Sequence, residues 1–308
     1  MADLVQIVLP VFGLILVGYS AGLLRLLSQQ TAAGLSDYVF TLGIPLLIFN
    51  TLINATLPAS QPWGYWMAYF GGLALVWIIA MRIGQKIFGL NYRQSVIAGF
   101  SAGQSNTVLV GIPLLLKAYG EPGAVPLFLL IAVHLPVTMT CATILFEGIS
   151  LKTARTLLPR LILHPILFGL VLGVLFRISG LELPAAVHSI IGSIAASALP
   201  CALIAMGLSL RHHGMNGNFK LSAAISLLKL MLHPALVYLF AFKIFTMPPV
   251  WSGVAVLFAA SPTGVNCYLF AAKYRTGEKI ASSAIAMTTA FSVFTSLFWL
   301  WWLGVKTI

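Results

Sequence analysis

The residues with the most chemical capacity lie in two short polar clusters, each in the middle of a long apolar run. The first cluster lies within 99–116, GFSAGQSNTVLVGIPLLL, and comprises Gln104, Ser105, Asn106 and Thr107. Three glycines and a proline in this segment make a continuous helix unfavourable. The segment therefore predicts a helix that is interrupted at its polar residues.

The second cluster lies within 258–270, FAASPTGVNCYLF, and comprises Pro262, Thr263, Gly264 and Asn266. A break in a helix frees backbone donors and acceptors, and the N-terminus of each half-helix favours an anion. One such segment could be a simple kink that neighbouring helices stabilise. Two of them in corresponding parts of the chain favour a binding site for a small organic anion.

These clusters are embedded in a chain whose composition suits a membrane. Of its 308 residues, 60% are hydrophobic and 7% are charged, against roughly 25% charged in soluble domains. Lipid must then cover the apolar surface, and a bilayer requires each spanning segment to satisfy its own backbone as a helix. Continuous apolar runs, without period-two alternation, argue against a barrel. The sequence predicts an all-α membrane protein.

Ten membrane spans are expected, and the two polar clusters lie in the fourth and the ninth. The short linkers leave no room for a soluble domain. The expected spans are 4–24, 36–53, 64–88, 95–116, 124–146, 161–178, 185–210, 221–245, 250–272 and 280–303.

Lys and Arg are distributed unevenly between alternate loops. Twelve of the 17 fall on one side, four on the other, and Lys229 falls inside the eighth span. The net charge of +11 therefore reflects topology and not a nucleic-acid-binding face. Because positive loops stay cytoplasmic, we expect both termini to face outward, with the loop around Ala59 outside and the loop around Arg155 inside.

The two halves of the chain repeat with an offset of 155 residues: Pro10, Gly18 and Pro45 recur as Pro165, Gly173 and Pro200. Five spans in each half is an odd number, so the second half would be inverted relative to the first. The sequence predicts two inverted five-helix repeats, 1–155 and 156–308, with the site between them.

Small residues in the first and sixth spans predict close helix packing. The pairs are Gly18 with Gly22, and Gly169 with Gly173, each at the four-residue spacing that lets two helix backbones approach.

Two further residues are candidates for the site. Asn50, in the second span, could reach a ligand or make an interhelical hydrogen bond. Lys229 lies about 12 Å along its helix from the cytoplasmic end, so it could snorkel outward or face the cavity and attract an anion. His233 follows one turn further in, and Pro234 could open the helix there.

Nothing in the sequence predicts a cofactor or a metal site. The three cysteines lie inside apolar runs, and the histidines of the spans are scattered without the spacing of metal ligands. All six acidic residues lie at span ends or in loops, so no pair of mid-membrane carboxylates is available for sodium or for a proton relay.

An intramembrane serine hydrolase is an alternative of another class. Gly99-Phe-Ser101-Ala-Gly103 matches the pattern of a nucleophile elbow, and His134 could serve as a base. That motif requires a strand-to-helix turn and an acidic residue to orient the histidine, and neither is expected here.

At these residues the chain resembles the auxin efflux carrier family, which includes the plant PIN carriers. Residues 106–115, NTVLVGIPLL, resemble the fourth-span motif of that family, and 262–274, PTGVNCYLFAAKY, resemble its ninth-span pattern. Residues 45–49, PLLIF, resemble its second span, and the spacing of Lys229 and Pro234 is similar to that of a basic residue and a proline in its eighth.

The resemblance implies a carrier of small organic anions, such as a mono- or dicarboxylate or an auxin-like acid, in the inner membrane of a bacterium. It implies crossed spans four and nine and an elevator movement. Spans one, two, six and seven would form a scaffold, which would also offer a surface for a homodimer. Asn106 matches the asparagine that contacts substrate, whereas Ser105 stands where plant members have a proline. A sodium-coupled symporter of the bile acid type shares this architecture and is the first alternative.

Overall fold

The computed structural model describes residues 2–55, 63–148, 165–211 and 217–305. Within these ranges the regular structure is helical, apart from one isolated bridge between Ser105 and Thr263. The helices are α1 (Ala2–Leu23), α2 (Gln29–Tyr38), α3 (Ile44–Asn54), α4 (Trp63–Lys86), α5 (Tyr92–Gly103), α6 (Ile112–Glu147), α8 (Pro165–Ser179), α9 (Ala185–Leu210), α10 (Phe219–Leu227), α11 (His233–Tyr238), α12 (Pro249–Ala260), α13 (Asn266–Lys273) and α14 (Glu278–Trp302). Four wider π-helical turns adjoin them: η1 (Val39–Gly43), η2 (Thr107–Gly111), η3 (Leu228–Leu232) and η4 (Leu239–Ile244).

Seven helices of the described ranges are long and apolar enough to cross a bilayer, whereas the sequence predicts ten spans. The difference has three local causes. The expected fourth span is broken after Gly103, and its second part runs on into the expected fifth as one 41-residue segment, Thr107–Glu147, kinked at Gly120. The expected ninth span is divided into α12 and α13, each too short to cross alone. The expected sixth span begins among residues outside the described ranges.

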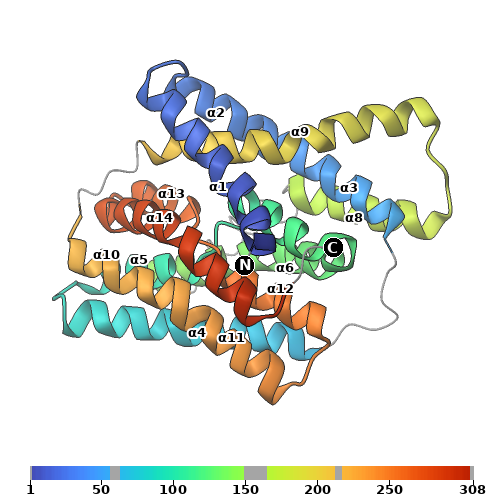
Figure 1. Cartoon of the computed structure of the whole chain (residues 1–308). Coiled ribbons are helices and arrows are strands. Elements are labelled where there is room, and N and C mark those ends of the chain that lie inside the picture. Colours follow the sequence, from blue (N-terminus) through green and yellow to red (C-terminus); the bar gives the residue numbers. More distant parts are fainter. Residues whose placement is uncertain (1, 56–62, 149–164, 212–216, 306–308) are drawn as a thin grey trace.

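The helices form two bundles (Figure 1). The first bundle comprises α1, α2, α3, α8 and α9, in which α1 packs on α9 and α3 packs on α8 and α9. The second bundle comprises α4, α5, α6 and α10 to α14, in which α4 packs on α5 and α11, and α12 packs on α6. The bundles meet where α1 contacts α14 and α6, where α3 and α8 contact α6, and where α9 contacts η2.

The first bundle is packed backbone against backbone. A Cβ atom added at Gly18 of α1 would lie 2.3 Å from the carbonyl oxygen of Ile204 on α9. One added at Gly169 of α8 would lie 2.4 Å from the carbonyl oxygen of Pro45 on α3. Only glycine permits such an approach. The close packing predicted for the first and sixth spans is confirmed.

Wide turns precede three prolines of the spans. η1, η2 and η3 end two residues before Pro45, Pro113 and Pro234. Proline has no N–H for the carbonyl one turn earlier, and its ring pushes that carbonyl away, so the preceding turn widens. Near Pro234 the carbonyl of Leu230 accepts a hydrogen bond from Trp299 Nε1 at 2.8 Å instead. The helix is therefore widened before Pro234 and continues beyond it as α11.

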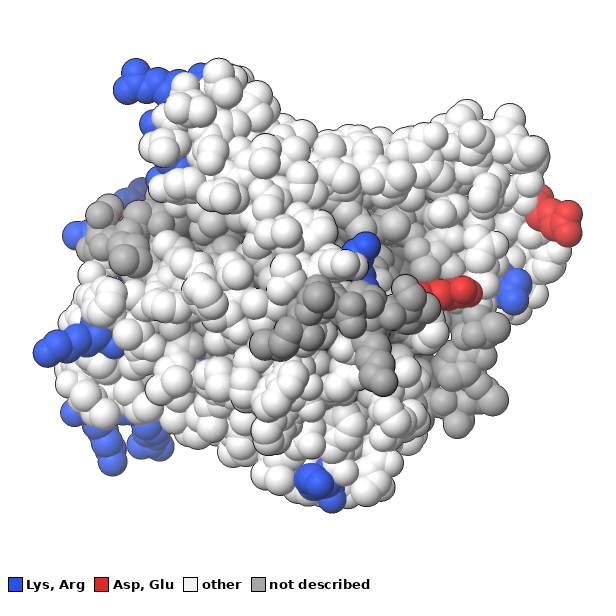
Figure 2. Space-filling view, in the orientation of Figure 1, with Lys and Arg blue, Asp and Glu red and all other residues white. Residues whose placement is uncertain are grey.

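On the face shown in Figure 2, basic side chains gather toward one end of the molecule. Most of the Lys and Arg side chains visible in Figure 2 lie at the left, near the place where α4 passes into α5 and α10 begins in Figure 1. The acidic side chains visible on this face lie toward the opposite end. The loops around Ala59 and Arg155, on which the predicted orientation also depends, lie outside the described residues.

Candidate functional site

The two predicted helix breaks meet in the interior of the second bundle. α5 ends at Gly103 and α12 ends at Ala260, and the extended segments that follow run antiparallel to each other. Asn106 N donates to Pro262 O at 2.7 Å, and Gly264 N donates to Gln104 O at 3.0 Å. We call these paired segments, 104–106 and 262–264, the crossing.

Side chains satisfy the carbonyl groups that the two breaks expose. The last carbonyls of a helix have no partner within it. At the end of α5, Thr263 Oγ1 donates to Ser101 O at 2.8 Å, so a residue of one break caps the helix of the other. At the end of α12, Lys229 Nζ donates to Ala259 O. The crossing is thus fixed by side-chain bonds as well as by its backbone bonds.

Lys229 reaches the crossing from η3. Its side chain is 0% exposed, so it does not snorkel to the surface. Its Nζ atom lies 2.9 Å from Ser105 Oγ and 3.4 Å from His233 Nδ1, in addition to the bond with Ala259 O. These three acceptors match the three N–H donors of an ammonium group. A cation also suits the C-terminal end of α12, where the helix dipole is negative.

His134 is a packing residue of the same interior. Its Nε2 accepts from Ser105 N at 3.3 Å, and its Nδ1 lies 3.0 Å from Tyr69 OH. Because Nε2 accepts from an amide, a neutral imidazole carries its proton on Nδ1 and donates it to Tyr69.

The serine hydrolase arrangement is not assembled. Ser101 lies inside α5 and not on a strand-to-helix turn, and its Oγ atom is buried without a hydrogen-bond partner in the described part of the chain. The ring nitrogens of His134 are bonded to Ser105 and Tyr69 instead. Nucleophilic catalysis needs the nucleophile and the base within hydrogen-bond reach, and this pair does not provide it.

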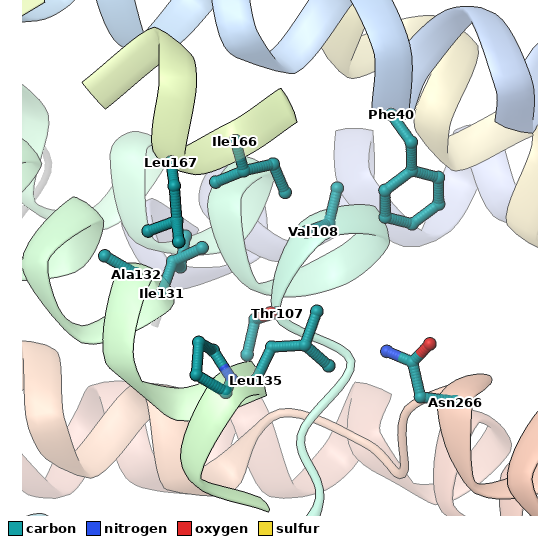
Figure 3. Close-up of a pocket in the computed structure, with 10 residues that line it drawn as sticks. Phe40, Thr107, Val108, Ile131, Ala132, Leu135, Ile166, Leu167 and Asn266 are labelled. Atoms are coloured by element: carbon teal, nitrogen blue, oxygen red, sulfur yellow. The ribbon is translucent and has the colours of Figure 1, made fainter. Parts of the chain in front are cut away.

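A cavity lies beside the crossing, where the two bundles meet (Figure 3). Phe40 of η1 and Ile166 of α8 close it from the first bundle. Its volume of ≈ 30 Å³ is enough for about one water molecule. The residues that line it are Phe40, Thr107, Val108, Ile131, Ala132, Leu135, Pro136, Ile166, Leu167 and Asn266.

The two hydrogen-bonding side chains of this cavity begin two half-helices. Thr107 is the first residue of η2 and Asn266 the first of α13, and neither helix start is capped by a side chain. Figure 3 shows the Asn266 amide pointing toward the residues that line the other side. The first N–H groups of a helix lack intrahelical partners and carry partial positive charge. Thr107 N and Cys267 N already donate to Ser105 O and Gly264 O. What the two helix starts offer an anion is therefore their partial positive charge, together with the side chains of Thr107 and Asn266.

The structure separates the predicted site residues into three groups. Thr107 and Asn266 line the cavity. Behind them, in or against the crossing, lie Gln104, Ser105, Pro262, Thr263, Gly264 and Lys229, all buried.

The third group comprises Asn106 and Asn50. Asn106 is 4% exposed, and its Nδ2 atom lies 3.2 Å from the sulfur of Met206 on α9, so its side chain reaches across to the first bundle. Asn50 lies on α3 outside the cavity lining, and its Oδ1 atom is buried without a partner in the described ranges. Its predicted hydrogen bond to another helix is not found there.

Sequence reasoning missed the apolar part of the lining. Phe40, Ile131, Ala132, Leu135, Ile166 and Leu167 have the same types as the residues that face lipid, so no residue type distinguishes them. Only Pro136, which lies inside α6, is a residue that is unusual within a helix.

Comparisons with known proteins agree with a transport role. The family model described as "Membrane transport protein" matches residues 3–152 and 147–300. A protein of Rhizobium meliloti named "Putative malonate transporter" is 28% identical over 96% of this chain and 94% of its own. An uncharacterized transporter of Methanothermobacter thermautotrophicus is 25% identical over 96% of each chain. Auxin efflux carrier component 8 of Arabidopsis thaliana is 24% identical over 95% of each.

Proposed function

Because the chain belongs to the membrane transport protein family and its relatives include an auxin efflux carrier component, we propose that it is a secondary carrier of a small organic anion. The observation that carries the proposal is the cavity beside the crossing, with the helix starts at Thr107 and Asn266 on it. Helix N-termini attract carboxylates. Asn106, next to Thr107, lies outside the lining of the closed cavity. We expect its Nδ2 to exchange its contact with the Met206 sulfur for a hydrogen bond to the anion when the bundles move.

A dicarboxylate is the substrate we would test first. Two helix N-termini at one cavity suit a ligand with two carboxylate groups. The name of the Rhizobium relative points in the same direction, since malonate is a short dicarboxylate. Monocarboxylates and auxin-like acids are the next candidates, because each offers one carboxylate and an apolar remainder to a mostly apolar lining.

Transport would require the bundles to move apart. A cavity of ≈ 30 Å³ is too small for malonate, so this conformation is closed around the site. The first bundle, spans one, two, six and seven, would be the scaffold of an elevator, and the second would move past it. The first bundle meets the cavity with apolar side chains such as Phe40 and Leu167, and the movement would exchange the contact between Asn106 Nδ2 and the Met206 sulfur. The ten spans would form the inverted repeats 1–155 and 156–308.

Orientation in the inner membrane follows from the charge bias, with both termini outward. Exposed positions at the two ends test it: Ser28, after α1, and Leu181, after α8. In a chain without the native cysteines, Ser28→Cys should resist an impermeant thiol reagent added outside, and Leu181→Cys should react. The opposite pattern would reverse the topology.

Binding tests the function itself. Purified protein in detergent is heated with malonate, other dicarboxylates, monocarboxylates and indole-3-acetate. A ligand of the folded state raises the melting temperature, and we expect the largest rise with a dicarboxylate. Chloride at matched ionic strength controls for general salt effects. No shift with any carboxylate, in protein that melts cooperatively, would contradict the proposal.

Two alternatives are tested with the same preparation. A symporter of the bile acid type would require sodium, so its anion uptake into proteoliposomes would stop when potassium replaces sodium. An intramembrane serine hydrolase would be labelled at Ser101 by a phosphonate probe, and Ser101→Ala would abolish the labelling. We expect uptake without sodium and no labelling of Ser101.

A further inference from the structure

Among the residues that the structure describes, Lys229 has no carboxylate partner. Its three contacts are a hydroxyl, an imidazole and a carbonyl, from Ser105, His233 and Ala259. The four titratable side chains that face it come from four elements, and none is an acid: Tyr69 on α4, His134 on α6, His233 on α11 and Cys267 on α13.

The other elements around η3 add no acid at this depth. α12 contains no titratable residue. α5, α10 and α14 have theirs within two residues of their starts: Tyr92, Arg93, Lys220, Glu278 and Lys279. The charge of a Lys229 ammonium is therefore balanced only by dipoles within the described part of the chain. A buried charge without a counter-charge is costly.

The contacts of Lys229 accommodate both of its protonation states. As an ammonium it donates to all three neighbours. As a neutral amine it has two N–H donors and one lone pair. The lone pair can then accept a hydrogen bond from the Ser105 hydroxyl or from a His233 ring N–H, since either group can donate or accept. Only the carbonyl of Ala259 must accept in both states. Loss of the proton thus breaks none of these three contacts, and His233 Nε2 is without a partner in the described residues in either state.

Ser105 connects Lys229 to the cavity. Its hydroxyl contacts Nζ, its backbone forms the crossing with Thr263, and Thr107 lines the cavity two residues later. An anion in the cavity would bring into this low-dielectric interior the negative charge that the ammonium lacks. Coulomb interactions are stronger there than in water. Anion binding and protonation of Lys229 would then favour each other, each by the same factor.

We propose that Lys229 takes up a proton when a carboxylate enters the cavity and returns it when the carboxylate leaves, so that a proton moves with each anion carried. The proton comes from water on the side where the anion binds, forms the third N–H bond of the ammonium and leaves on the other side. The proposal rests on the proposed function, because it requires an anion in this cavity.

Titration calorimetry of the purified full chain with malonate tests the coupling. Binding heats measured in two buffers of different ionisation enthalpy, at the same pH, give the number of protons taken up. We expect uptake approaching about one proton per malonate in part of the range from about pH 6 to 9. Lys243→Gln, which removes an exposed lysine from the same span, should leave this number unchanged.

Two variants distinguish an effect of proton uptake by Lys229 from an effect of its positive charge alone. A guanidinium stays protonated, so Lys229→Arg should bind malonate without proton uptake, and its transport should ignore an imposed pH gradient that drives the wild type. Lys229→Gln should bind about tenfold more weakly and take up no proton. If Lys229 had only a structural role, these substitutions would change stability but would not change the number of protons taken up on malonate binding.

The outcomes distinguish the two proposals. Malonate binding without proton uptake by the wild type throughout this pH range would overturn the coupling and leave the carrier standing. Unaltered proton uptake by Lys229→Arg would also overturn it. If neither variant folds, the wild-type affinity must still fall as pH rises through the range of proton uptake, and a constant affinity would contradict the coupling. Absence of binding by any carboxylate would overturn both proposals.

Discussion

The two bundles differ in how their helices pack against one another in the membrane. In the described ranges, every buried Ser, Thr, Asn, Gln, His or Lys side chain belongs to the second bundle or its crossing. The first bundle has none, and its helices approach through glycines such as Gly18 and Gly169. Without water to expel, helices associate in lipid by close packing or by hydrogen bonds. The first bundle relies mainly on close packing, with a hydrogen bond between Tyr38 OH and Ser197 Oγ at 2.5 Å. The second bundle adds buried hydrogen bonds to close contacts such as that of Gly99 with Trp77.

The difference indicates a division of labour. Polar groups inside a membrane protein are costly, and they are retained where they serve a site. The second bundle contains them around the crossing, next to the cavity that the first bundle closes with apolar side chains. The first bundle is therefore suited to be a rigid frame, and the second to hold an anion.

The largest effect is expected from a substitution that disrupts the glycine packing of the first bundle. A Cβ atom at Gly207 would lie 2.0 Å from Ile15 O, so Gly207→Ala should force α1 and α9 apart and destabilise the fold by about 3 kcal/mol or more. Gly192, on the same helix, has open space around it, and Gly192→Ala should be neutral or slightly stabilising. Thermal unfolding of the two variants in detergent measures the difference. Equal melting temperatures would remove the contrast between the bundles.

The next effect concerns affinity. Asn106→Ala should weaken anion binding by about 1–3 kcal/mol, the range for a hydrogen bond to a charged group, with folding largely intact. Asn54→Ala, on an exposed position of the first bundle, should leave affinity alone. Calorimetric titration with malonate compares them. Unchanged binding by well-folded Asn106→Ala would take this residue out of the site.

A smaller loss of stability is expected from a substitution in the second bundle. Thr263→Val keeps the shape of the side chain but removes the hydroxyl that caps Ser101 O, which should cost about 1–2 kcal/mol because a buried carbonyl loses its partner. Thr295→Val removes a longer bond of 3.4 Å near the surface of α14 and should cost less. The pair is compared by thermal unfolding, and an effect no larger at Thr263 would mean that its hydroxyl does not help to hold the crossing.

The smallest effect is expected at Asn266. Its side chain is half-buried and lines the cavity, where water can replace part of its interaction with an anion. Asn266→Ala should therefore weaken binding by about 1 kcal/mol or less. A loss larger than that of Asn106→Ala, measured in the same titration, would shift the centre of the site to the start of α13.

The features of the fold and the site that can be predicted are those marked by a distinctive residue pattern in the sequence. Both breaks could be predicted, because proline and clustered polar residues have few other uses in the middle of a span. That the two spans cross is implied by the family resemblance, whereas the residue-by-residue pairing of 104–106 with 262–264 comes from the structure. The glycine contacts at Gly18 and Gly169 were also predictable, since the four-residue spacing has one main structural use.

Other features depend on the direction in which side chains point, which the sequence leaves open. Lys229 was expected either to snorkel or to face the cavity, and it does neither: η3 turns it toward Ser105. Asn50 was grouped with the site because it is polar, yet it lies outside the cavity lining. The apolar lining around Phe40 and Ile166 could not be recognised, because lipid and a closed cavity select the same residue types.

Uptake of radiolabelled malonate into proteoliposomes tests most directly the claim that an anion is carried between the two bundles. The comparison needs wild-type protein, Asn106→Ala and protein-free vesicles, with reconstitution checked by the amount and orientation of protein. The account predicts uptake by the wild type above the protein-free vesicles and a severalfold lower rate for Asn106→Ala at limiting malonate. Uptake at equal rates by wild type and Asn106→Ala would contradict the site. Wild-type uptake no faster than that of protein-free vesicles, with malonate and with the other carboxylates of the binding panel, would contradict the carrier.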